Sequence, residues 1–165
     1  MTLDDLNALD DDEAPRTFLR CCGSSRWARE MAAARPFPSA ETMAGTADAI
    51  WLALDRTDWL EAFAAHPKIG TTRAGWAQQE QAGVAGAAEQ TRRRLADANR
   101  DYHSRFGYIF IVCATGKTAG EMLALLERRL RHDAGEELGI AAEEQRQITQ
   151  LRLKKLLERE SDTTT

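Results

Sequence analysis

The chain has 165 residues, of which 43% are hydrophobic and 29% charged, and its formal net charge is -4. This length fits one domain, over residues 1–160 with a flexible tail at 161–165, and the acidic balance argues against nucleic-acid binding, which needs a basic surface. No apolar run approaches the length of a membrane span, and the acidic start Met1-Thr2-Leu3-Asp4-Asp5 lacks a secretory signal. We therefore expect a cytoplasmic protein that is not bound to a membrane.

Helical patterns dominate the first part of the chain. We predict a helix capped by Ser24 that runs to about Ala34, one capped by Ser39 from Ala40 to Leu54, and one capped by Thr57 that ends at His66. Because Pro67 disfavours the α conformation in the residue before it, His66 should face whatever lies beyond the helix. A lone histidine at a helix end is commonly solvated or compensates the helix dipole, so the position alone is a weak sign of catalysis.

Carboxylate and amide side chains crowd the segment from Trp76 to Val84, where Glu80 and Gln81 precede Gly83. Such pairs are ordinary on solvated helix faces. Beyond Gly86, the pattern predicts a long polar helix from Ala87 to Arg105 with Leu95, Ala98 and Tyr102 on one side.

An apolar run follows at Phe106 to Ala119 and ends in a turn of small residues that opens onto another helix. Tyr108 to Val112 is too apolar and too short for a surface helix, so we expect it to be buried, either as a single core strand or as extended backbone that binds a ligand. Thr118 and Glu121 predict a capping box, and the next helix carries the stripe of a core helix at Met122, Leu123, Leu125, Leu126 and Leu130.

The last helix is predicted from about Gly135 to Arg159, with Arg152 one turn from Ile148 and close to the buried face. A buried guanidinium needs an anion or acceptors, which could be a structural carboxylate or the carboxylate of a substrate.

The remaining ionisable residues indicate no metal site. His66, His103 and His132 are scattered without the spacing of zinc ligands, and Cys113 in the apolar run reads as a buried small hydrophobe. We interpret the basic clusters Arg92-Arg93-Arg94 and Arg128-Arg129 with Arg131 as solvated helix faces.

The chain resembles the OHCU decarboxylase family in motifs that occur in the family's order. They are His66-Pro67-Lys68-Ile69-Gly70, Glu80-Gln81-Ala82-Gly83, Arg105-Phe106-Gly107 through Gly116-Lys117, and Ile148-Thr149-Gln150-Leu151-Arg152-Leu153. Phe18 to Ser24 followed by Trp27, and Ala34-Arg35-Pro36-Phe37, are similar to the family's amino-terminal pattern, so the resemblance covers nearly the whole chain.

The resemblance implies an all-α, compact multi-helix fold of the family's own and a homodimer. The implied activity is a lyase without cofactor or metal that converts 2-oxo-4-hydroxy-4-carboxy-5-ureidoimidazoline (OHCU) to S-allantoin in urate breakdown. By resemblance His66 is the general acid/base and Glu80 its acidic partner. The implied substrate-binding residues are Pro67, Ala77, Gln81, Phe110, Ile111, Val112, Cys113, Ala114 and Arg152.

One departure from the family is Ala77, where a serine is common, so a hydroxyl that would hydrogen-bond the substrate is missing. The stretch between His66 and Glu80 is also short in comparison with longer members of the family. Two alternatives stay open: a related lyase or hydrolase acting on another ureide-like ring, and a non-catalytic helical dimerisation module.

Overall fold

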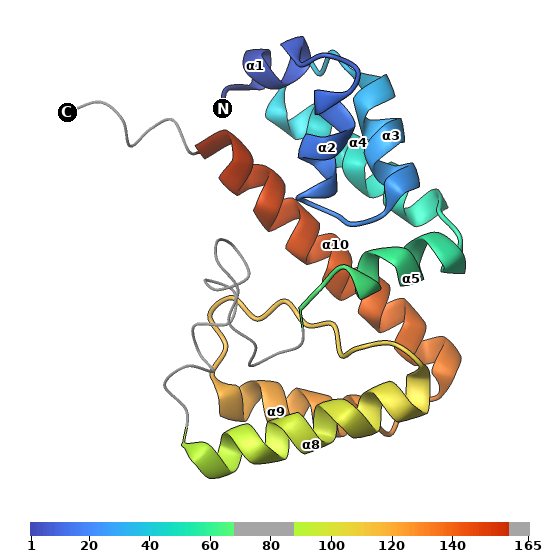
Figure 1. Ribbon diagram of the computed structural model, residues 1–165, viewed down its shortest axis with the longest axis vertical. Coiled ribbons are helices and arrows are strands. Elements are labelled where there is room, and N and C mark those ends of the chain that lie inside the picture. The colour runs from blue at the N-terminus through green and yellow to red at the C-terminus, as the bar shows by residue number, and fades with distance from the viewer. Residues whose placement is uncertain (68–87, 159–165) are drawn as a thin grey trace, which may run out of the picture. The chain divides into compact units, whose positions relative to one another are not determined.

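The computed structural model describes residues 1–67 and 88–158, and in these ranges every regular element is a helix, as the all-α prediction requires (Figure 1). The chain divides into two compact units: unit 1 comprises Met1–Ala62 and Arg146–Thr165, and unit 2 comprises Phe63–Gln145. Helix α10 (Ala134–Glu158) contributes residues to both units. None of the described helices is long and apolar enough to cross a membrane.

Unit 1 begins with α1 (Leu3–Ala8), α2 (Glu13–Leu19), α3 (Ser25–Ala34) and α4 (Ala40–Ala53), followed by most of α5 (Arg56–Ala64). Its core contains the fully buried side chains of Leu6, Phe18, Trp27 and Met31. The Trp27 indole packs edge-on against the Phe18 ring, with 6.0 Å between centroids, and donates a hydrogen bond of 3.1 Å to the Ala47 carbonyl. The indole therefore joins α3 to both α2 and α4.

Two of the three predicted caps in unit 1 are confirmed. The Ser24 side chain accepts a hydrogen bond from the Trp27 N–H, and Ser39 accepts one from the Thr42 N–H. The Thr57 cap is wrong because α5 begins at Arg56, and the Asp55 carboxylate accepts from the Asp58 N–H at 3.1 Å. Aspartate is among the strongest capping residues, and here it takes the position before the helix.

Unit 2 contains α8 (Glu89–Phe106), α9 (Ala119–Arg129) and the first part of α10. Leu95, Ala98 and Tyr102 are buried, as predicted for one side of α8. The helix ends at Gly107, whose φ of 83° is a left-handed conformation that glycine adopts without strain. This turn starts the extended segment that carries the apolar run.

The predicted helix after the run begins where the sequence indicates, since the Thr118 hydroxyl accepts a hydrogen bond from the Glu121 N–H. Only this half of the predicted capping box is present, because the Glu121 carboxylate bonds with the Thr118 hydroxyl at 3.1 Å and not with the Thr118 backbone. Met122, Leu123 and Leu126 are buried, whereas Leu125 and Leu130 are only partly so. The interpretation of Arg129 as a solvated residue is wrong: it is 4% exposed, although Arg128 and Arg131 are exposed. Arg129 is buried because it has a buried carboxylate partner.

Candidate active site

The extended segment Phe110–Ala114 lies in unit 2 between α8 and α9, and each of its five residues is at most 9% exposed. Within the described residues it forms no strand, so the core-strand alternative is wrong, whereas the predicted burial is confirmed. Cys113 is buried, as expected. Buried extended backbone outside a sheet must find partners for its polar groups elsewhere.

Side chains hold two carbonyls of this segment. Arg129 Nη1 donates a hydrogen bond of 2.5 Å to the Ile111 carbonyl, and Lys117 Nζ donates one of 2.7 Å to the Cys113 carbonyl. No backbone carbonyl in the described parts of the chain accepts a hydrogen bond from the N–H groups of Phe110, Ile111, Val112 or Ala114. The segment thus has the Ile111 and Cys113 carbonyls held by side chains, while four of its amide N–H groups form no backbone hydrogen bond within the described residues.

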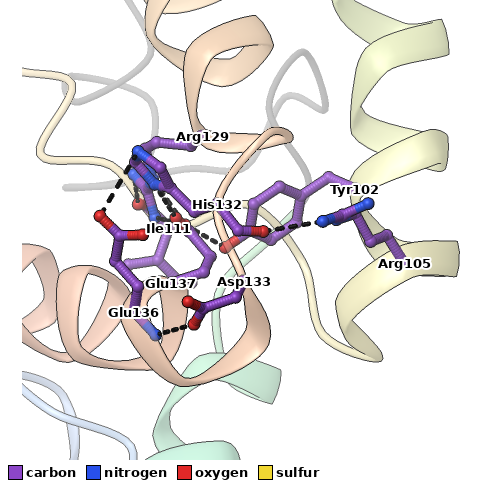
Figure 2. A network of polar contacts seen from close by, with 8 residues as sticks. All are labelled: Tyr102, Arg105, Ile111, Arg129, His132, Asp133, Glu136 and Glu137. Carbon is purple, nitrogen blue, oxygen red and sulfur yellow. Dashed lines mark hydrogen bonds and ion pairs between the residues drawn. The ribbon is translucent and has the colours of Figure 1, made fainter.

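A buried network supports the segment (Figure 2). The Glu137 carboxylate, which is fully buried, accepts hydrogen bonds from Arg129 Nε at 2.6 Å and from the Tyr102 hydroxyl at 2.5 Å. Arg129 Nη2 also lies 2.6 Å from the same oxygen, as an ion pair without a directed hydrogen bond. Burial and the hydrogen bond to Glu137 raise the pKa of Tyr102, so its hydroxyl stays protonated and donates.

Further polar residues lie next to the network formed by Arg129, Glu137 and Tyr102. His132 Nδ1 lies 3.0 Å from the second Glu137 oxygen, so His132 is less solvated than its charged neighbours suggest. Arg105 Nη2 donates a hydrogen bond of 2.8 Å to the His132 carbonyl. On α10, burial raises the pKa of the Glu144 carboxyl, while Arg129, Lys117 and a hydrogen bond from the Cys113 backbone oppose that rise.

His66 lies two residues beyond α5, which ends at Ala64 and not at His66 as predicted, and its backbone N–H donates to the Phe63 carbonyl at 3.2 Å. Its half-buried ring has Nε2 2.5 Å from the side-chain oxygen of Gln145, a fully buried residue of α10. Both residues belong to unit 2, as do Pro67 and the segment Phe110–Ala114. The imidazole is therefore held by a neutral amide.

Arg152 belongs to unit 1, where it is half-buried and its Nη1 lies 3.5 Å from the Cys21 carbonyl. Burial raises the pKa of Cys21 to about 12, although the charges of Arg152 and Arg20 oppose the rise. Because Arg152 and His66 are in different units, their convergence on one substrate stays a prediction. Glu80, Ala77 and Gln81 lie outside the described residues, so their predicted roles also stay predictions.

The sequence reading missed three residues that the structure places beside the predicted ones. Gln145 contacts His66, and Arg129 with Glu137 supports the segment at Ile111. The spacing of eight residues between Arg129 and Glu137 across a helix-helix turn was a weak signal for their pairing. In the described part of the chain, no group of three or more histidine, cysteine, aspartate or glutamate side chains is placed to hold a metal ion.

Comparison with known proteins gives this helical architecture a family. The family model "OHCU decarboxylase" matches residues 7–154, so the chain belongs to the OHCU decarboxylase family. A solved structure described as OHCU decarboxylase in the presence of (S)-allantoin is 39% identical, with a TM-score of 0.79 over 90% of this chain and 99% of that one.

Among curated relatives, the uric acid degradation bifunctional protein TTL of Arabidopsis thaliana is 40% identical over 82% of this chain and 45% of its own length. The 2-oxo-4-hydroxy-4-carboxy-5-ureidoimidazoline decarboxylase of Haloferax volcanii is 28% identical over 93% of this chain and 94% of its own. The chain thus spans less than half the length of the Arabidopsis bifunctional protein.

Proposed function

We propose that the chain is a cofactor-independent carboxy-lyase that converts OHCU to S-allantoin in urate breakdown. The observation that carries the proposal is the family match over residues 7–154, which includes His66, the segment Phe110–Ala114 and Arg152. The buried amide donors of that segment support it from the geometry, because they suit the polar edge of a ureido-substituted ring.

The reaction removes carbon dioxide from a ring carbon that carries both a hydroxyl and a carboxylate. The electron pair of the broken carbon-carbon bond forms a double bond to the ureido-bearing carbon, and the π pair of the adjacent carbon-nitrogen double bond moves onto the ring nitrogen. That nitrogen takes up a proton, and an enol is left. A proton then adds to the ureido-bearing carbon on one face, and loss of the enol proton gives the ketone of S-allantoin. Because the substrate accepts the electron pair itself, no cofactor is needed for this step.

Each site residue has a task in this proposal. The amides of Phe110 to Ala114 orient the ring and so select the face that receives the proton. His66 exchanges the proton, since histidine titrates near neutral pH, and such acid/base help contributes about 10²–10⁴-fold. Glu80 orients His66 or binds the ureido group, and Arg152 pairs with the substrate carboxylate. Pro67, Ala77 and Gln81 line the rest of the pocket.

We further propose that the protein acts in the cytoplasm as a homodimer. Family membership and the absence of a membrane-spanning helix among the described residues are compatible with both statements. Light scattering coupled to size-exclusion chromatography tests the assembly, and a mass of about 18.4 kDa, that of one chain, would contradict the dimer.

The test of activity generates the substrate in situ from urate with upstream enzymes and follows circular dichroism after this protein is added. We expect rapid appearance of S-allantoin above the slow racemic background. His66→Ala should abolish the acceleration and leave the far-ultraviolet spectrum unchanged. His103→Ala is the matched control, because His103 is exposed on α8.

Two results would overturn parts of this proposal. A His66→Ala protein with near-normal rate would remove His66 from the mechanism. Wild-type protein that leaves only the racemic background would reject the substrate and favour another ureide-like ring, which the missing hydroxyl at Ala77 keeps open, or a non-catalytic helical module.

A further inference from the structure

We propose that Gln145 is a positioning residue for His66, which it holds in the tautomer that carries the proton on Nε2 and leaves Nδ1 as the basic nitrogen. The role of His66 in catalysis rests on the proposed function. The contact between Gln145 and His66 is independent of the proposed function, because the structure describes it directly: Gln145 Oε1 lies 2.5 Å from His66 Nε2.

The chemistry of the two groups determines which atom carries the proton. An amide oxygen has lone pairs and no hydrogen, so it can only accept. A nitrogen that bonds to it at 2.5 Å must therefore be the donor, which places the proton on Nε2 in the neutral ring. In that tautomer proton exchange with a substrate takes place at Nδ1.

Gln145 is well placed for this task because it lies on a long helix and is fully buried. Its neighbours along the buried side of α10, Ala141 and Ile148, are 0% and 5% exposed, so packing restricts its rotamers. His66, by contrast, lies two residues beyond Ala64, the last residue of α5, and precedes Pro67, outside any regular helix. The rigid partner can orient the residue that the helix no longer constrains.

Gln145 itself brings no charge to the imidazole. A glutamate at position 145 would accept the same hydrogen bond, but its negative charge would favour the imidazolium form. The charged residues that flank Gln145 on α10 have other contacts: Glu144 bonds with the Cys113 backbone, and Arg146 Nη1 lies 3.2 Å from Asp48. Gln145 therefore fixes the orientation of the His66 ring without adding a charge to its surroundings.

The decisive measurement is nitrogen NMR of the histidine rings in wild type, Gln145→Met and Gln145→Glu, with the His66 signals assigned from a His66→Asn spectrum. In wild type we expect the Nε2-protonated tautomer. Gln145→Met removes the acceptor at similar volume, so the two ring nitrogens should move toward averaged shifts. Gln145→Glu should keep the tautomer and raise the midpoint of the His66 titration by about one pH unit or more.

Kinetics supply a second readout that a merely structural residue would not move. Gln145→Met should lower kcat about tenfold, a part of the ~10²–10⁴-fold that acid/base catalysis provides, with KM changed less than about twofold. Gln145→Glu should retain more activity than Gln145→Met and shift the acidic limb of the kcat/KM profile to higher pH. Gln147→Glu makes the same charge change at an exposed position of α10. It should change neither kcat nor the acidic limb of the kcat/KM profile.

The outcomes separate this inference from the proposed function. If the wild type fails to accelerate S-allantoin formation, the proposed function fails, and the NMR result still decides the role of Gln145. If Gln145→Met leaves the His66 tautomer and titration unchanged, the inference is overturned whatever the activity. If Gln145→Met does not fold, an unshifted His66 titration in Gln145→Glu overturns it equally.

Discussion

Two arginines, one partly buried in unit 1 and one buried in unit 2, bind backbone carbonyls in different ways. In unit 1, Arg35 donates to the carbonyls of Leu6, Asn7, Leu9 and Ala32 at 2.8–3.3 Å, and its nearest carboxylate, the exposed Asp11, is 4.0 Å away. In unit 2, Arg129 donates to one carbonyl, that of Ile111, and is paired with a carboxylate that is fully buried.

The difference shows two ways to satisfy a guanidinium that is removed partly or fully from solvent. Arg35 joins the ends of α1 and α3 and leaves its charge close to solvent, so its contribution consists mainly of hydrogen bonds to carbonyls that helix ends leave unpaired. Arg129 is half of a desolvated ion pair, which is sensitive to the loss of either partner. The geometry of the segment at Ile111 therefore depends on the pairing of Arg129 with Glu137, whereas the contact of Arg35 with the ends of α1 and α3 depends on no buried ion pair.

The largest expected effect comes from Arg129→Met, which leaves the Glu137 carboxylate buried without its cation. We expect a loss of about 3–5 kcal/mol in the free energy of unfolding, measured by urea denaturation. The double variant Arg129→Met with Glu137→Met should recover much of this loss, because no uncompensated charge remains. A single variant within about 1 kcal/mol of wild type would contradict the ion-pair interpretation.

A smaller effect is expected from Arg35→Met, because the carbonyls at the ends of α1 and α3 lose their donor but no buried carboxylate is left behind. The loss should be about 1–3 kcal/mol by the same measurement. Arg16→Met, at an exposed position of α2, is the matched control and should change little. Adding Asp11→Asn to Arg35→Met should restore nothing; a clear recovery would place Arg35 in the same class as Arg129.

Alkaline pH sharpens the contrast further, because unit 1 buries neutral thiols where unit 2 buries an ion pair. Burial raises the pKa of Cys21 to about 12 and of Cys22 to about 11, from an ordinary value of 9.0. Between the ordinary pKa of 9.0 and the raised values, the native state holds more thiol protons than the unfolded state. The contribution of the two thiols to the free energy of unfolding is therefore complete below pH 9 and is lost as pH rises toward 11 and 12.

The effect is the smallest of the three because it is absent at neutral pH. Urea midpoints measured at pH 8 and pH 10 should therefore fall more in wild type than in a Cys21→Ala, Cys22→Ala double variant. Urea midpoints of Tyr102→Phe at the same two pH values provide the comparison in unit 2, since burial also raises the pKa of Tyr102. If the urea midpoint falls equally between pH 8 and pH 10 in wild type and in the cysteine variant, the thiols are not the source of the alkaline loss of stability.

Local sequence signals predicted the helices well and their polar partners poorly. Ser24, Ser39 and Thr118 cap helices as predicted, because a cap depends only on residues within one turn. Thr57 was wrong by two positions because two candidate caps, Asp55 and Thr57, compete in one short stretch. Arg129 was wrong because neighbouring arginines made its helix look solvated, although its partner Glu137 lies beyond the turn.

By itself the sequence determined the all-helical class, the burial of the apolar run and membership of the OHCU decarboxylase family, because periodicity, capping and ordered motifs are properties of the chain read in one dimension. Only the tertiary structure decided that Gln145 meets His66, 79 positions away, and that Arg129 holds the Ile111 carbonyl. Such pairs form when packed helices bring distant side chains together, and a helical period records which face is buried without recording what that face will contact.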